Sequence, residues 1–197
     1  EEVAITAGRL GITGEANITK FTDAVIKMAN ATVLSADQAA NSMARIAKAM
    51  GIPIENVNYL GSMIDRLANT AAANAEQITT AMRRAAGASK VLGIPAEALA
   101  AMATTLIEAG DEAARTGTRL SRAFTYASIK TAVMARQMGI SVSELRKRME
   151  EDMLAVWLDY LKMLKDTPSK TERLAKAHEV FGMIGSKAII KLANNYD

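Results

Sequence analysis

The side chains that could do chemistry are few, and they do not gather into a recognisable site. His178 is the only histidine, and the chain has no cysteine. A metal site needs three or four ligands, and a catalytic nucleophile needs a base and an orienting partner. Glu172 and Glu179 lie near His178 in the chain, but their spacing does not place two ligands on one helix face. We therefore predict no catalytic residue, no metal site and no cofactor, and we expect that the protein is not an enzyme.

Residues 182–187, Gly-Met-Ile-Gly-Ser-Lys, superficially resemble a phosphate-binding loop. The gap between the glycines is too short for the nucleotide-binding P-loop, and no strand precedes it. The same letters contain the Gly-x-x-Gly of KH domains, but that module needs a sheet. We interpret the segment as a turn between two helices, with Gly182 and Gly185 breaking the helical pattern.

The densest basic cluster is Arg-Lys-Arg at residues 146–148. Three consecutive residues of a helix point in three directions, so they do not form one phosphate-binding face. Glu144 is placed to pair with Arg148 four residues later. We predict that this cluster is a solvated helix surface.

Arg115, Arg119 and Arg122 are a better candidate for a basic stripe, because their spacing puts them on one helix face. No aromatic side chains interleave with them, as single-stranded nucleic acid would require for base stacking. The chain carries 24 basic and 21 acidic residues, for a formal net charge of +3, so its charge is mixed. We therefore do not expect nucleic acid as a partner.

The elements that must position these side chains are helices separated by a recurring Gly-Ile dipeptide. Glycine adopts the left-handed conformation that closes a helix. Thr, Ser or Pro then suits the start of the next helix, with glutamate in its first turn. The four glycines lie 40, 42 and 46 positions apart, and this period indicates a helical repeat array. The dipeptides begin at Gly11, Gly51, Gly93 and Gly139, and the glutamates are Glu15, Glu55, Glu97 and Glu144.

Two capping boxes mark the start of two similar helical hairpins. Ser35 with Gln38 and Asn74 with Gln77 have the spacing at which side chains and backbone amides cap each other reciprocally. The two caps lie 39 positions apart. Residues 35–70 and 74–109 are therefore predicted to be two copies of one hairpin, each with an apolar face that a neighbour must cover.

Beyond Gly110 the pattern changes to longer helices. One helix is predicted over residues 111–138, capped by Asp111. The next, over residues 141–165, has an apolar stripe at spacings of three and four that includes Trp157, which we expect to be buried. Breaks are predicted at Pro168 and Gly182, with a last short helix after them.

These patterns predict an all-α array of helical hairpins with Gly-Ile or Gly-Ile-Pro joints, about eight to nine helices and no sheet. Residues 1–110 are expected to form the tandem hairpin repeats, and residues 111–197 the longer helices and short C-terminal helices of the same region. Half of the residues are hydrophobic but only 4% are aromatic, which favours closely packed helices. Because the sequence begins with Glu-Glu rather than Met, we expect a fragment of a longer chain.

The chain resembles the core region of phage tail tape measure proteins, and three features carry the resemblance. The first is the repeated Gly-Ile-Pro joint with its glutamate, at residues 51–55 and 93–97. The second is the stretch 99–110, which ends in Ala-Gly and leads after six residues into Gly-Thr-Arg-Leu-Ser-Arg at 117–122. The third is Val-Phe-Gly at 180–182, before a helix rich in Ala and Ile.

Two positions depart from the family's pattern. Thr116 stands where alanine is common before Gly-Thr, and Arg119 stands where a small residue is common. These departures concern the placement within the family and leave the expected fold unchanged.

The resemblance implies a structural protein of a phage or prophage tail that sets tail length, templates assembly of the tail tube and leaves the tube at DNA ejection. It implies tail tube and tail-tip or assembly proteins as partners, and self-association in the tail. It also implies a place in the tail lumen of the virion, and in the host cytoplasm during assembly. No small-molecule substrate is implied, and any membrane contact would occur at ejection and outside this region.

Three alternatives remain open at this point. One is a helical scaffold or adaptor domain that binds protein partners and has no link to phages. Another is a nucleic-acid-binding helical domain, which would require salt-dependent binding to DNA. The third is an enzyme such as a cell-wall hydrolase, which would require a pair of acidic residues in a cleft.

Overall fold

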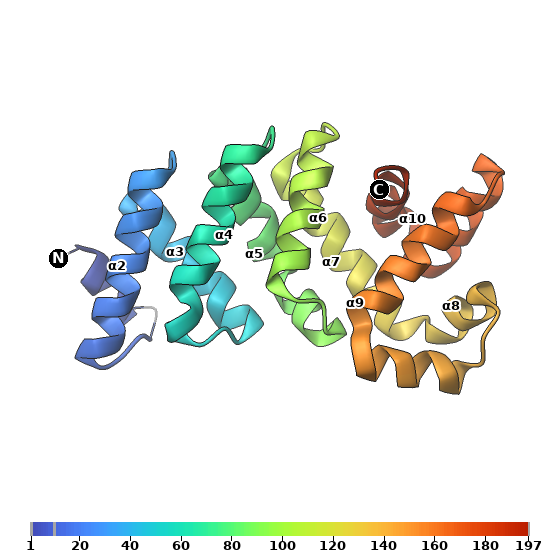
Figure 1. Cartoon of the computed structure of the whole chain (residues 1–197), viewed down its shortest axis with the longest axis horizontal. Helices are drawn as coiled ribbons and strands as arrows, with labels where there is room; N and C mark the ends of the chain where they lie inside the picture. The colour runs from blue at the N-terminus through green and yellow to red at the C-terminus, as the bar shows by residue number, and fades with distance from the viewer. Residues whose placement is uncertain (1, 10, 197) are drawn as a thin grey trace.

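The computed structural model describes residues 2–9 and 11–196, and their backbone is helical almost throughout (Figure 1). These residues form ten α-helices and one short 3₁₀ helix, and no strand occurs among them. The prediction of an all-α fold is confirmed, and the helix count is close to the eight to nine expected. The elements are α1 (Glu2–Arg9), α2 (Glu15–Ala31), α3 (Ala36–Met50), η1 (Ile54–Asn56), α4 (Val57–Thr70), α5 (Ala75–Leu92), α6 (Ala96–Glu108), α7 (Ala113–Ile129), α8 (Thr131–Met138), α9 (Val142–Asp166) and α10 (Lys170–Asn194).

Helices α2 to α7 form two rows along the long axis of the molecule. In Figure 1, α2, α4 and α6 stand side by side in the front row, with α3, α5 and α7 behind them. Helix α5 packs against α3 on one side and against α7 on the other. The two predicted hairpins are therefore α3–α4 and α5–α6, stacked as consecutive repeats. The longer helices α9 and α10 cover the far end of the array.

The predicted caps define the ends of these helices. Ser35 and Gln38 cap each other reciprocally, and so do Asn74 and Gln77. Gly51 (φ 70°) and Gly93 (φ 87°) end α3 and α5 in the left-handed conformation. The expected breaks at the other glycines are also present, with positive φ angles at Gly11, Gly110, Gly139 and Gly182.

The helix predicted over residues 111–138 is two helices, so that prediction is wrong. Helix α7 ends at Ile129 and α8 begins at Thr131, with Lys130 (φ −94°, ψ 29°) between them. The predicted cap is wrong by one residue as well. Glu112, rather than Asp111, accepts hydrogen bonds from the backbone amides of Ala114 and Arg115.

The helix over residues 141–165 is also interrupted, against the prediction of one continuous helix. Asp152 has an extended backbone (φ −156°, ψ 91°) in the middle of α9. Its Oδ1 accepts a hydrogen bond from the amide of Ala155 at 2.9 Å. Asp152 therefore acts as an N-cap for the second half of α9, and the chain changes direction at this residue.

Two close contacts between helices hold α5, α7 and α10 together. Gly117 of α7 lies against the backbone of Ala81 on α5, and Gly185 of α10 lies against the backbone of Ala123 on α7. A side chain at either glycine would collide with these backbone atoms. Gly185 was expected to break a helix, but it lies within α10 and is buried, and only Gly182 interrupts that helix.

Aromatic side chains fill the core where α7, α9 and α10 meet. Trp157 is 1% exposed, which confirms the prediction that it is buried. Its ring lies edge-on to Phe124 at 5.0 Å and to Phe181 at 5.8 Å between centroids. Tyr160 packs edge-on against Phe181 from the next turn of α9. These rings join the second half of α9 to the hairpin array.

Candidate interaction surfaces

His178 lies exposed on α10, away from any set of ligands. Its neighbour Glu179 is engaged elsewhere, because Arg136 and Gln137 of α8 donate hydrogen bonds to its carboxylate. These hydrogen bonds, with Arg136 the larger cause, hold the pKa of Glu179 below its ordinary value. Over residues 2–9 and 11–196, no group of three His, Cys, Asp or Glu side chains is placed to hold a metal ion.

Residues 182–187 do not form a phosphate-binding loop. Gly182 (φ 64°) bends α10, and the helix resumes directly after it. Gly185 is pressed against the backbone of Ala123, so there is no open cradle of backbone amides for an anion. Met183 and Ile184 are exposed beside Tyr126 and Arg122 of α7. The segment is a bend in a packed helix.

The basic cluster at residues 146–148 is solvated, as predicted, but one of its ion pairs is not the predicted one. Lys147 pairs with Glu151 at 4.0 Å on the surface of α9. Arg148 pairs with Asp159 rather than with Glu144. The break at Asp152 turns the second half of α9 so that Asp159 comes within reach of Arg148.

Arg119 belongs to a buried ion-pair cluster rather than to a surface stripe. Its Nη1 lies 2.5 Å from Oδ2 of Asp111, whose side chain is only 7% exposed. Lys191 of α10 donates to the other carboxylate oxygen and also to the carbonyl of Ala109, at 3.0 Å. Burial alone would raise the pKa of Asp111, but the hydrogen bonds from Lys191 and Arg119 outweigh it and hold the pKa below its ordinary value.

Replacing Asp111 with asparagine is expected to lower the free energy of unfolding by about 2 kcal/mol, because Arg119 loses its partner while remaining largely buried. The folded-state pKa of Asp111 is lower than 3.8, so its contribution is fully present above that pH and is lost as the pH falls through the folded pKa. Urea unfolding at pH 7 and at pH 3 tests both points. The difference between Asp111→Asn and the parent protein should shrink at the lower pH, and a constant difference would contradict this account.

Shallow apolar grooves recur between successive joints of the array. A groove of about 540 Å³ lies between the second and third joints and includes Ile52, Pro53, Tyr59 and Pro95. A smaller one of about 270 Å³ lies between the first and second joints. The side chain of Tyr59 is 59% exposed there. An apolar surface therefore lies between the first and second joints and again between the second and third.

The structure also brings together a set of arginines that the sequence analysis missed. Arg45, Arg84 and Arg122 each lie ten residues after the N-cap residue of α3, α5 or α7, and each is exposed. We call these three residues the arginine row. The signal was present in their spacing of 39 and 38 positions. Arg122 is equivalent to Arg45 and Arg84 when counted from Glu112, so the signal lies in equivalent positions of successive helices and not within one helix.

In the part of the chain that the structure describes, every helix is too short or too polar to cross a lipid bilayer.

The fold defines an all-helical repeat protein, and its exposed apolar grooves and arginine row are surfaces suited to contact with other molecules. Residues 1–182 match the family described as phage-related minor tail protein, and the chain therefore belongs to that family. It is thus a structural protein of a phage tail, part of a virion, and it interacts with other tail components. No curated protein and no solved structure matches the chain.

Proposed function

We propose that this chain acts as a tape measure, setting the length of the tail and templating assembly of the tail tube, and that it leaves the tube when DNA is ejected. One observation carries the proposal. The hairpins α3–α4 and α5–α6 repeat with matching caps 39 residues apart and joint glycines 42 residues apart. In such an array, each added repeat contributes a fixed increment of length.

The size of that increment depends on the form that the chain takes in the tail. As one continuous helix, 39 residues would extend about 58 Å. As a folded hairpin packed on its neighbour, the same residues would advance the array by only about 10 Å. Pro53 and Pro95, after the left-handed glycines, oppose conversion to one unbroken helix. Tail length therefore distinguishes the two forms.

The proposed partners are the tail tube and the tail-tip or assembly proteins, with several copies of the chain associating in the tail lumen after synthesis in the host cytoplasm. The recurring grooves at the joints support such contacts, since a repeating surface suits a partner made of repeated subunits. In this proposal residues 1–110 form the measuring array and residues 111–197 continue it. The region carries no catalytic or metal centre and takes no small-molecule substrate.

Deleting residues 35–73 in the phage genome tests the ruler directly. The deletion removes one repeat and puts Asn74 in the place of Ser35, so that a capping residue still follows Leu34. Tails measured by electron microscopy should shorten by about 58 Å if the region is extended, or by about 10 Å if it stays folded. Duplicating residues 35–73 should lengthen tails by the same amount.

A swap of equal length serves as the control. Replacing residues 35–73 with a second copy of 74–112 keeps the residue number and the hairpin, so tail length should not change. If deletion and duplication both leave tail length unchanged, the ruler role is wrong for this region. The second candidate, a helical scaffold that docks other tail proteins, would then be favoured by the exposed grooves at the joints.

A further inference from the structure

We propose that the arginine row binds the phosphate backbone of nucleic acid without reading its sequence. This function goes beyond the measurement of length. It rests on the position of the three arginines in the repeat, on the charge of the helices that carry them, and on the side chains around them.

The repeat places the three arginines on one face of the array. Two residues before each arginine lies a core residue, which is Met43, Met82 or Leu120. Two residues correspond to a rotation of about 200° around a helix, so each arginine points away from the core. Because α3, α5 and α7 pack side by side, with axes about 8–10 Å apart, the three arginines lie on successive neighbouring helices.

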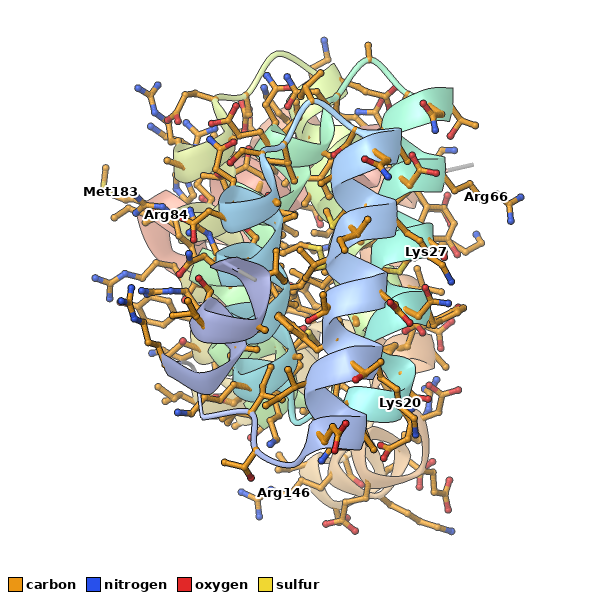
Figure 2. The ribbon with its side chains drawn as sticks, turned by 90° about the vertical axis from the view of Figure 1, so that its left-hand side faces the viewer. Lys20, Lys27, Arg66, Arg84, Arg146 and Met183 are labelled. Carbon is orange, nitrogen blue, oxygen red and sulfur yellow. The ribbon has the colours of Figure 1, made fainter. Side chains whose placement is uncertain are left out.

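Figure 2 shows this face from the end of the array. Arg84 projects on the side of α3 and α5, whereas Lys20, Lys27 and Arg66 project on the opposite side, from α2 and α4. The base of the Arg84 side chain lies against α7, close to Gly117. Gly117 lies five residues before Arg122, so Arg84 meets α7 about 7.5 Å along the helix from Arg122.

The back row of helices is strongly basic, and the front row is not. Apart from Arg119, which pairs with the buried Asp111, helices α3, α5 and α7 contain seven Lys and Arg against two acidic residues within the helices and Glu112 at the cap of α7, whereas α2, α4 and α6 contain three against five. The two acidic residues of the back row, Asp37 and Glu76, are in first turns, about 12 Å along the helix from the arginines. Arg83 and Arg115 are exposed on the same helices and add to the positive potential.

The surroundings of the row favour phosphate over an acidic protein surface. One turn before each arginine lies a polar residue, Asn41, Thr80 or Thr118. A stable protein interface needs a buried apolar centre, usually with aromatic anchors. Contacts to phosphate need only charge and hydrogen-bond donors, and the arginine fork matches phosphate oxygens. Exposed apolar residues border the row at its α10 end, where Tyr126, Met183 and Ile184 lie beside Arg122. The other large exposed apolar residues of α5 and α7, Val91 and Ile129, lie toward the C-terminal ends of these helices.

The test measures the affinity of the protein for a fluorescein-labelled 20-base-pair DNA duplex of random sequence. Fluorescence anisotropy gives the binding constant at each of several salt concentrations. The triple variant Arg45→Gln, Arg84→Gln, Arg122→Gln should reduce the slope of log K against log salt by about 2.7 and weaken binding roughly 100-fold at 0.1 M salt. The control is Lys20→Gln, Lys27→Gln, Arg66→Gln, which removes the same charge from the front row. Its affinity should stay within about twofold of the parent protein.

Replacing the three arginines by lysine should preserve the salt slope, because each charge is kept. Circular dichroism melting of every variant checks that the fold is intact. Equal weakening in both glutamine variants would overturn the proposal, since net charge alone would then explain binding. Absence of binding by the parent protein would overturn it too. Binding of polyglutamate with no binding of DNA would assign the row to an acidic protein partner instead.

Discussion

Replacing Trp157 with alanine is expected to lower the free energy of unfolding by about 3–5 kcal/mol. The indole is 1% exposed and touches rings from two other helices, Phe124 on α7 and Phe181 on α10. Removing it leaves a cavity that these rings cannot fill, because each is held by its own helix. The loss should appear as a lower midpoint in chemical denaturation, followed by circular dichroism because the variant has no tryptophan.

Leu158→Ala is the matched control, since the next residue of the same helix is 39% exposed. Its effect should be within about 0.5 kcal/mol of zero, as for most surface substitutions. Trp157→Phe should recover part of the loss, because it keeps an aromatic ring and removes an indole N–H that has no hydrogen-bond partner. Equal stability of Trp157→Ala and Leu158→Ala would mean that this part of α9 does not close the core.

The hairpin repeats could be predicted because their ends are determined by local chemistry. The caps at Ser35 and Asn74 act within four residues, and the left-handed turns at Gly51 and Gly93 need only the absence of a side chain. Because the same signals recur at nearly the same interval, a helix boundary that is ambiguous in one hairpin can be predicted from the equivalent position in the other. This is why the prediction was most accurate over residues 35–109.

The breaks in the second half could not be predicted in the same way. Lys130 separates α7 from α8 with neither glycine nor proline nearby, so the break depends on how α8 packs against α9 and α10. Asp152 interrupts an apolar stripe that continues from Met149 to Met153 as though the helix were intact. An aspartate within a helical pattern can be a solvated residue of a continuous helix or the N-cap of a new helix. Tertiary packing decides which of the two forms.

Charge was predicted less well than helix position, for a geometric reason. Arg115, Arg119 and Arg122 share a face of one helix, but Arg119 is drawn to Asp111 and leaves the surface. Arg45, Arg84 and Arg122 are far apart in sequence, and they come onto successive neighbouring helices only when the hairpins stack. A basic surface in a repeat protein is assembled from equivalent positions of successive repeats, so inspection of single helices does not detect it.

The contact that brings these repeats together is the close approach of α7 to α5 at Gly117. Replacing Gly117 with alanine is expected to lower the free energy of unfolding by about 3 kcal/mol, at the upper end of the range for overpacking. A Cβ atom there would lie 2.7 Å from Cβ of Arg84 and 3.0 Å from Cα of Ala81. Neither atom can rotate away, so the two helices would have to separate and lose apolar contact along their length.

Gly87→Ala in the neighbouring helix is the matched control for this prediction. Gly87 is helical and exposed, and a Cβ atom there would meet nothing within 4 Å. Since alanine favours the helix over glycine by about 1 kcal/mol, Gly87→Ala should stabilise the protein, and the two substitutions should have opposite signs in urea unfolding. If Gly117→Ala is stabilising as well, α5 and α7 do not pack as closely as the structure has them. The same result would remove the basis for placing Arg84 and Arg122 in one row, because that contact aligns their helices.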